Sequence, residues 1–127
     1  MSFLGFAALR AVLLRQAAEG SFTWDGGMET LLPPGIDVAA LRNTMGIEVE
    51  AMGTAHPAPP AVIDTALVLL TFRTAFGAHA ALWERAAIKA MRFIADAIHG
   101  HVYEIRPWLD RCQRKLTETT PASAPTT

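Results

Sequence analysis

Hydrophobic and polar positions are most regularly spaced between residues 80 and 99. At about 100° per residue, the apolar side chains of this stretch fall within an arc of about 120°, as in a helix that buries one face. They are Trp83, Ala87, Ala90, Met91, Ile94, Ala97 and Ile98. Charged residues gather on the opposite face: Arg85, Lys89, Arg92 and Asp96. Gly100 is of a residue type at which helices commonly end, so the pattern predicts a helix over residues 80–99.

Residues 61–76 are apolar on every side, so periodicity alone does not separate a buried helix from a buried strand. Pro59 and Pro60 as a start signal, Asp64 as a candidate N-cap and Gly77 as a stop favour a helix. The β-branched residues of the run favour a strand: Val62, Ile63, Val68, Thr71 and Thr74. We expect a helix here, buried on most of its circumference.

Two further helices are expected nearer the N-terminus. Residues 2–18 are apolar nearly all round and are followed by Gly20 as a stop signal. Residues 35–45 form a shorter helical pattern, with Asp37 near the cap and Gly46 as the stop. The inward residues of the shorter pattern are Val38, Leu41 and Met45.

Two short runs are predicted to be strands. Residues 47–52 alternate with period two, which predicts a strand whose exposed face carries Glu48 and Glu50. Residues 101–105 show a similar but shorter alternation, and Pro107 is then expected to start a last helix. The inward residues of that helix are predicted to be Trp108, Leu109, Cys112 and Leu116.

These elements predict a mainly α fold, a small helical domain of about four helices with one or two short strands. An α+β fold, with residues 62–76 as a strand and helices packed on a small sheet, is the alternative. Residues 21–34 are a packed connector, and the proline-rich residues 53–60 are a stiff linker. A single globular domain is expected over residues 1–117, followed by a disordered tail over residues 118–127.

Composition indicates a protein that associates with other chains. The chain has 127 residues, of which 51% are hydrophobic and only 18% charged, so some apolar surface is expected to be covered by a partner. The candidate contact residues are Phe3, Phe6, Leu13, Phe72 and Phe76. The predicted partner is a protein, either a second copy or a larger assembly.

The net charge of −1 conceals an uneven distribution. Residues 1–64 carry three basic and seven acidic side chains, a net charge of −4, and residues 65–127 carry eight and five, a net charge of +3. This polarity suits packing between the two halves or head-to-tail association of copies. The basic half is too weakly charged for a nucleic-acid-binding surface, so no nucleic acid is expected as a partner.

Membrane and secretory signals are not expected. Arg10 and Arg15 interrupt and follow the first apolar run, whereas a secretory signal carries its basic residues before that run. A spanning helix needs about 20 consecutive apolar residues, and Arg73 and His79 interrupt the longest candidate. Peripheral membrane contact of the first helix stays open. A single cysteine forms no internal disulfide, which suits the cytoplasm, or a virion if the protein is viral.

A possible metal site centres on His99 and His101, with Asp96 and Glu104 near them, because imidazole and carboxylate are ordinary ligands of zinc. The two histidines flank a helix end, where histidine is also favoured by the helix dipole, and this second explanation is preferred. Cys112 is similarly expected to be a packing residue rather than a nucleophile. No phosphate-binding loop or nucleophile elbow is present, so no cofactor is expected.

The sequence therefore predicts a structural or interaction protein rather than an enzyme, a small subunit that self-associates or joins a larger assembly such as a viral or bacterial complex. The alternative function is a small metal- or ligand-binding catalytic domain that uses the His99 and His101 region.

Overall fold

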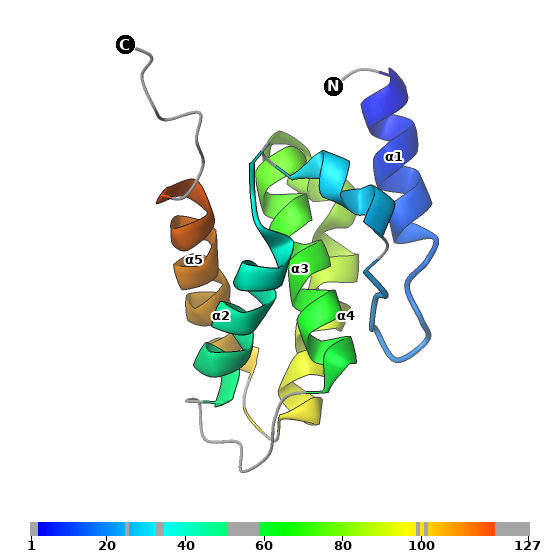
Figure 1. Ribbon diagram of the computed structural model, residues 1–127. Helices are drawn as coiled ribbons and strands as arrows, with labels where there is room; N and C mark the ends of the chain where they lie inside the picture. Colours follow the sequence, from blue (N-terminus) through cyan, green and yellow to red (C-terminus); the bar gives the residue numbers. More distant parts are fainter. Residues whose placement is uncertain are drawn as a thin grey trace.

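The central element of the fold is the helix α3, Pro60–Ala75, shown in green in Figure 1. Pro60 lies in its first turn, where the missing N–H costs no hydrogen bond. Every residue from 65 to 72 is buried, so the helix is covered on all sides by neighbours that include α2, α4 and α5. The expected helix at this position is confirmed, and the alternative strand over residues 62–76 is wrong.

The computed structural model describes residues 3–24, 26–32, 35–50, 59–98, 100 and 102–118. Within these ranges the chain forms five α-helices, two 3-10 helices and no strand, so the fold is mainly α, as predicted. The predicted linker and the predicted disordered tail lie almost entirely outside the described residues.

The amphipathic helix predicted over residues 80–99 is α4, Ala80–Ala97. The chain reaches it from α3 through the short 3-10 helix η2, Gly77–His79, and bends by 91° on the way. Its buried residues include Ala87, Ala90, Met91 and Ile94, all of the predicted apolar face. The backbone N–H of Gly100 donates to the carbonyl of Ala95 at 2.9 Å, which closes the helix near the predicted stop.

Both predicted strands are helical wherever the structure describes them. Residues 47–50 belong to α2, Val38–Glu50, and residues 102–105 belong to α5, Val102–Glu118. Short alternation misled the prediction because positions four residues apart satisfy both a period of two and a helical turn. The helical spacing is the one that buries side chains: Leu41, Met45 and Val49 are all buried along α2.

The boundaries of α2 and α5 also differ from the prediction. Asp37 caps α2 as expected, since its carboxylate Oδ1 accepts the N–H of Ala40 at 3.1 Å, but the helix continues through Gly46. Pro107 lies inside α5 rather than at its start. The buried residues of α5 explain the earlier start, because they follow helical spacing from a position before the proline: Ile105, Trp108, Leu109, Cys112 and Leu116.

The N-terminal segment packs against the other helices through α1, Phe3–Leu13, and the loop that follows it. The helix is shorter than the predicted residues 2–18, because the chain turns back on itself after Leu14. The side-chain amide of Gln16 donates to the carbonyls of Gly20, at 3.0 Å, and of Ala86 in α4, at 2.9 Å. The connector then continues through the 3-10 helix η1, Gly26–Leu31, and buries Phe22, Met28 and Leu32 as anchors.

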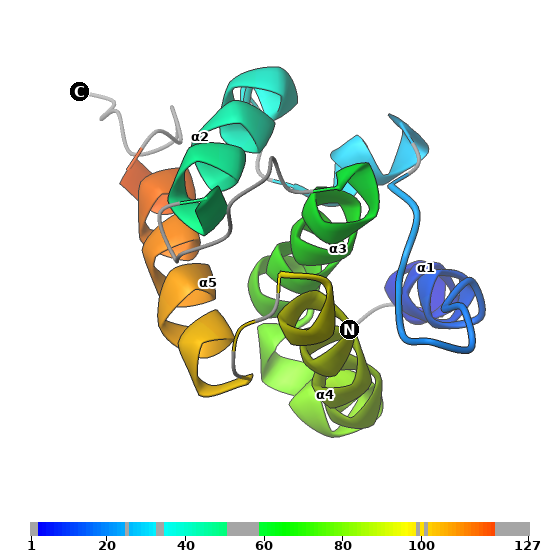
Figure 2. The same ribbon diagram turned by 90° about the horizontal axis from the view of Figure 1, so that it is seen from below.

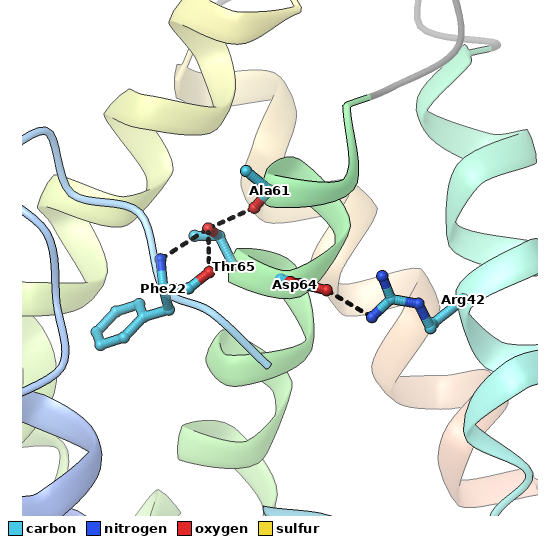
Figure 3. Close-up of polar contacts among 5 residues, drawn as sticks. All are labelled: Phe22, Arg42, Ala61, Asp64 and Thr65. Atoms are coloured by element: carbon cyan, nitrogen blue, oxygen red, sulfur yellow. Dashed lines mark hydrogen bonds and ion pairs between the residues drawn. The ribbon is translucent and has the colours of Figure 1, made fainter. Parts of the chain in front are cut away.

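Thr65 of α3 forms a hydrogen bond between this connector and the central helix (Figure 3). Its hydroxyl donates to the carbonyl of Ala61 at 2.6 Å and accepts the backbone N–H of Phe22 at 3.0 Å. Thr65 is completely buried, so this hydroxyl satisfies a connector N–H that has no access to water. On the opposite side of the same turn, Asp64 binds Arg42 of α2 at 2.6 Å and does not cap the helix, whose N-cap residue is Pro59.

We predict that Thr65→Val lowers the free energy of unfolding by about 1–3 kcal/mol, because valine keeps the shape but leaves the N–H of Phe22 without an acceptor. Thr71→Val is the matched control. Thr71 is equally buried, but its hydroxyl bonds only to the carbonyl of Leu67 in its own helix at 2.9 Å, so we expect a change below about 0.5 kcal/mol. Urea denaturation of both variants measures the difference, and equal losses would contradict the assigned role of Thr65.

Candidate interaction surfaces

The residues predicted for a metal site are only partly described. Asp96 is exposed on α4 and Glu104 is half-buried on α5, whereas His99 and His101 lie outside the described residues. Among the residues that the structure does describe, no three His, Cys, Asp or Glu side chains lie close enough together to hold a metal ion. The catalytic alternative that uses the two histidines stays an untested prediction.

Cys112 lies on the buried face of α5, as expected for a packing residue. Burial raises the pKa of its thiol to about 12, and the nearby carboxylate of Glu48 adds to this shift. A thiol with this pKa stays protonated at neutral pH, and the thiolate is the nucleophilic form. The geometry therefore favours the structural role of Cys112.

The predicted contact residues fall into two groups. Phe72 and Phe76 are 0% and 3% exposed, so the fold uses both side chains in its own core and leaves neither for a partner. Leu13 is half-buried against the core. Phe6 is 49% exposed, and Phe3 begins α1, although its side chain lies outside the described part.

An apolar strip runs along the outward side of α1. Phe6 and Leu14, 49% and 73% exposed, lie eight residues apart with Arg10 midway between them. Ala7 and Ala11 are exposed beside them. Leu14 directly follows the last residue of α1, and its N–H still donates to the carbonyl of Arg10 at 3.0 Å as in the helix. Positions four residues apart share one side of a helix, so these side chains form a single surface, here called the α1 face. Scattered exposed apolar residues are ordinary, but several on one helix face are typical of a contact surface.

A groove of about 430 Å³ opens between the start of α2 and the end of α5. Ile36, Leu41 and Leu116 give it an apolar lining, and the exposed carboxylate of Asp37 lies at its edge. We call it the α2–α5 groove. Sequence reasoning did not find it, because its walls come from residues more than seventy positions apart in the chain.

An ionic cluster fixes the two walls of this groove relative to each other. Glu48 of α2 binds Lys115 of α5 at 2.8 Å and Arg111 at 3.5 Å. These pairs join the acidic half of the chain to its basic half, in agreement with the packing between halves that the charge distribution suits. Arg73–Asp110, at 2.6 Å, instead joins two residues of the basic half.

The α1 face and the α2–α5 groove lie on opposite sides of the molecule. In Figure 1, α1 stands on the right and the pair α2 and α5 on the left, with α3 and α4 between them. Figure 2, turned by 90°, shows the same separation. The α1 face of one molecule therefore does not reach the groove of the same molecule.

No single helix in the described ranges has the length and apolarity to cross a membrane; only α3 and α4 taken together do, and the chain is sharply bent between them. Comparison with protein-family models, with curated proteins and with solved structures gives no match.

Proposed function

We propose that this protein is a non-enzymatic assembly subunit that associates head to tail with further copies of itself, in the cytoplasm or in a virion. The α1 face of one copy is the inserted surface, and the α2–α5 groove of the next copy is the receiving surface. The observation that carries the proposal is the exposure of Phe6 and Leu14 along one side of α1, whereas Leu9 and Val12 of the same helix are buried.

The two surfaces have complementary chemistry. Arg10 lies between Phe6 and Leu14 on the α1 face, and Asp37 lies at the edge of the apolar groove. Lys115 also lines the groove, but its charge is paired with Glu48 at 2.8 Å. Burying aromatic and aliphatic side chains supplies the free energy of such a contact, and the opposite charges fix its register.

The placement of the two surfaces favours one kind of assembly. Because the two surfaces differ and lie on opposite sides, the contact is heterologous, and an open assembly keeps one free α1 face at one end and one free groove at the other until a ring closes. A symmetric dimer would use the same patch twice, so it would place Arg10 near Arg10 of the second copy through the α1 face, or Asp37 near Asp37 through the groove.

The first test measures molar mass by size-exclusion chromatography with light scattering over a wide range of protein concentrations. We expect the mass of the full chain to rise with concentration, and Phe6→Ser to weaken association by about tenfold or more through the loss of a buried aromatic anchor. Ile47→Ser is the matched control, since Ile47 is 60% exposed on α2 outside both surfaces and its replacement is expected to change nothing. A monomer at every concentration, or equal effects of the two variants, would contradict the proposal.

The second test examines the charges. Asp37→Asn removes the charge at the groove but keeps a side chain that caps α2 well, and Arg10→Gln removes the charge on the α1 face. If Arg10 and Asp37 meet across the contact, the double variant associates no more weakly than either single variant. Strictly additive losses would show that they do not meet.

Peripheral membrane contact is the competing use of the α1 face. Cosedimentation with vesicles of anionic lipid, measured on the full chain and on Phe6→Ser, separates the two. Vesicle binding that depends on Phe6, by a protein that remains monomeric without vesicles, would replace the head-to-tail assembly.

A further inference from the structure

A second concave site lies where α3, α4 and α5 meet, on neither of the surfaces described above. It is a cleft of about 350 Å³, within the size range of small-molecule sites. Its floor is apolar and buried, and is made by Leu69, Ala87, Met91 and Leu109. Charged side chains from all three helices form its rim: Arg73, Glu84, Arg106 and Asp110.

One wall of the cleft is rigid and aromatic. The ring of Trp83 stacks on the buried ring of Phe72, with centroids 5.5 Å apart and planes inclined by 19°. Its indole N–H donates to the carbonyl of Phe76 at 2.9 Å, so both its apolar and its polar part are held in place. A flat surface fixed in this way suits an apolar or aromatic ligand body.

The cation at the rim lies deeper than the anion that it binds. The side chain of Arg73 is 19% exposed, and its Nη1 binds Oδ1 of Asp110 at 2.6 Å, whereas the side chain of Asp110 is 58% exposed. A guanidinium that is withdrawn from water needs a carboxylate partner, but an exposed aspartate gives up this partner and rotates into solvent at little cost. The present position of the Asp110 carboxylate therefore marks where a ligand carboxylate fits.

We propose that the α3–α4–α5 cleft binds a small amphipathic carboxylic acid. The apolar body of the ligand lies on Trp83 and Met91, and its carboxylate replaces Asp110 on Arg73. Arg106, also on the rim, adds a second positive charge on the side of α5, and the negative charge of the rim that stays in place is that of Glu84 on the side of α4. Guanidinium groups pair with carboxylates through parallel hydrogen bonds, which makes the acid rather than an alcohol or an amine the expected ligand class.

Three probes with the same body test this proposal: 4-phenylbutyrate, 4-phenylbutan-1-ol and 4-phenylbutylamine. Isothermal titration and ligand-observed NMR on the full chain give their affinities. We expect the acid to bind about fivefold or more tightly than the alcohol, and the amine to bind most weakly. Binding of none of the probes at millimolar concentration, equal binding of acid and alcohol, or preference for the amine would each overturn the proposal.

Asp110→Asn provides the decisive variant, because it removes the competing carboxylate and leaves Arg73 in place. The affinity for the acid should rise by about threefold or more, while the affinity for the alcohol should stay within about twofold. Arg73→Met should remove the preference for the acid. An unchanged acid affinity in Asp110→Asn would show that the ligand does not compete with this side chain.

Two further variants separate this cleft from other apolar surface. Ala80 is exposed and lines the cleft, so Ala80→Trp fills its mouth without removing a core contact, and binding of the acid should be lost. Phe6→Ser, which acts on the α1 face, should bind the acid as the unaltered chain does. The opposite pattern would assign the binding to the α1 face, and circular dichroism of each variant confirms that the helical fold is retained.

Discussion

Replacing Ile94 by alanine is expected to lower the free energy of unfolding by about 2–5 kcal/mol, among the largest effects of any single truncation in this chain. Ile94 is 0% exposed and lies at the middle of the buried face of α4, which packs against α3 and α5. Two residues of that face, Ala87 and Ala90, have no side-chain length with which to fill the space left behind. The cost is therefore both lost burial and an unfilled cavity, and urea denaturation measures it.

Arg92→Ala is the matched control for Ile94→Ala. Arg92 is exposed on the opposite side of the same helix, and alanine is an equally good helix former, so we expect a change below about 0.5 kcal/mol. If this variant is as unstable as Ile94→Ala, the exposed side of α4 is covered by a partner and its assignment as a solvent-facing surface is wrong.

Gly20→Ala should have the second largest effect and lower the free energy of unfolding by about 2 kcal/mol or more. Gly20 has a φ of 106°, which side chains rarely adopt, and a Cβ at this position would lie 2.5 Å from the carbonyl oxygen of Lys89. That oxygen belongs to the backbone of α4, so it does not move aside as a flexible side chain would. The N-terminal segment would have to separate from α4, with loss of the bond between Gln16 and Ala86.

Gly46→Ala is expected to raise the free energy of unfolding, whereas Gly20→Ala lowers it. Gly46 lies in the interior of α2, and a Cβ built there meets nothing within 4 Å. Alanine at such a position favours the helix by roughly 0.5–1 kcal/mol. Thermal and urea denaturation of both variants give the comparison. Both glycines were predicted to be helix stops, but replacing them by alanine should change the free energy of unfolding in opposite directions. A Gly20→Ala variant that is more stable than the unaltered chain would refute the close contact with α4.

Long amphipathic patterns made the helices predictable, and short patterns did not. Residues 80–99 hold five turns of consistent periodicity, so the predicted apolar face of α4 includes all of its buried residues except Ala95. Residues 47–52 hold fewer than two turns, in which the spacing of Met45 and Val49 is hidden by the alternating Glu48 and Glu50. Packing of α2 against α3 and α5, which buries Leu41, Met45 and Val49, decides between the two periods.

The candidate surfaces were predictable only where one helix carries them. The grouping of Phe6, Arg10 and Leu14 on one side follows from helical spacing alone. Whether such a side faces the core or solvent depends on which other helices pack against it. Phe72 was an equally apolar candidate, but it is fully buried because other helices cover α3. The α2–α5 groove requires helices that are distant in sequence, and the α3–α4–α5 cleft requires three helices packed together, so no local pattern indicates either of them.

The contacts of the N-terminal segment have a consequence for the order in which the chain folds. α3, α4 and α5 follow one another closely and pack mainly on each other, so their contacts close short loops and form early. The bonds from Phe22 to Thr65 and from Gln16 to Ala86 span 43 and 70 residues, and neither can form before its receiving helix exists. During synthesis on the ribosome, α1 is therefore made before α3 and α4 but cannot dock until both exist, so Leu9 and Val12, which are buried in the folded protein, stay exposed until then.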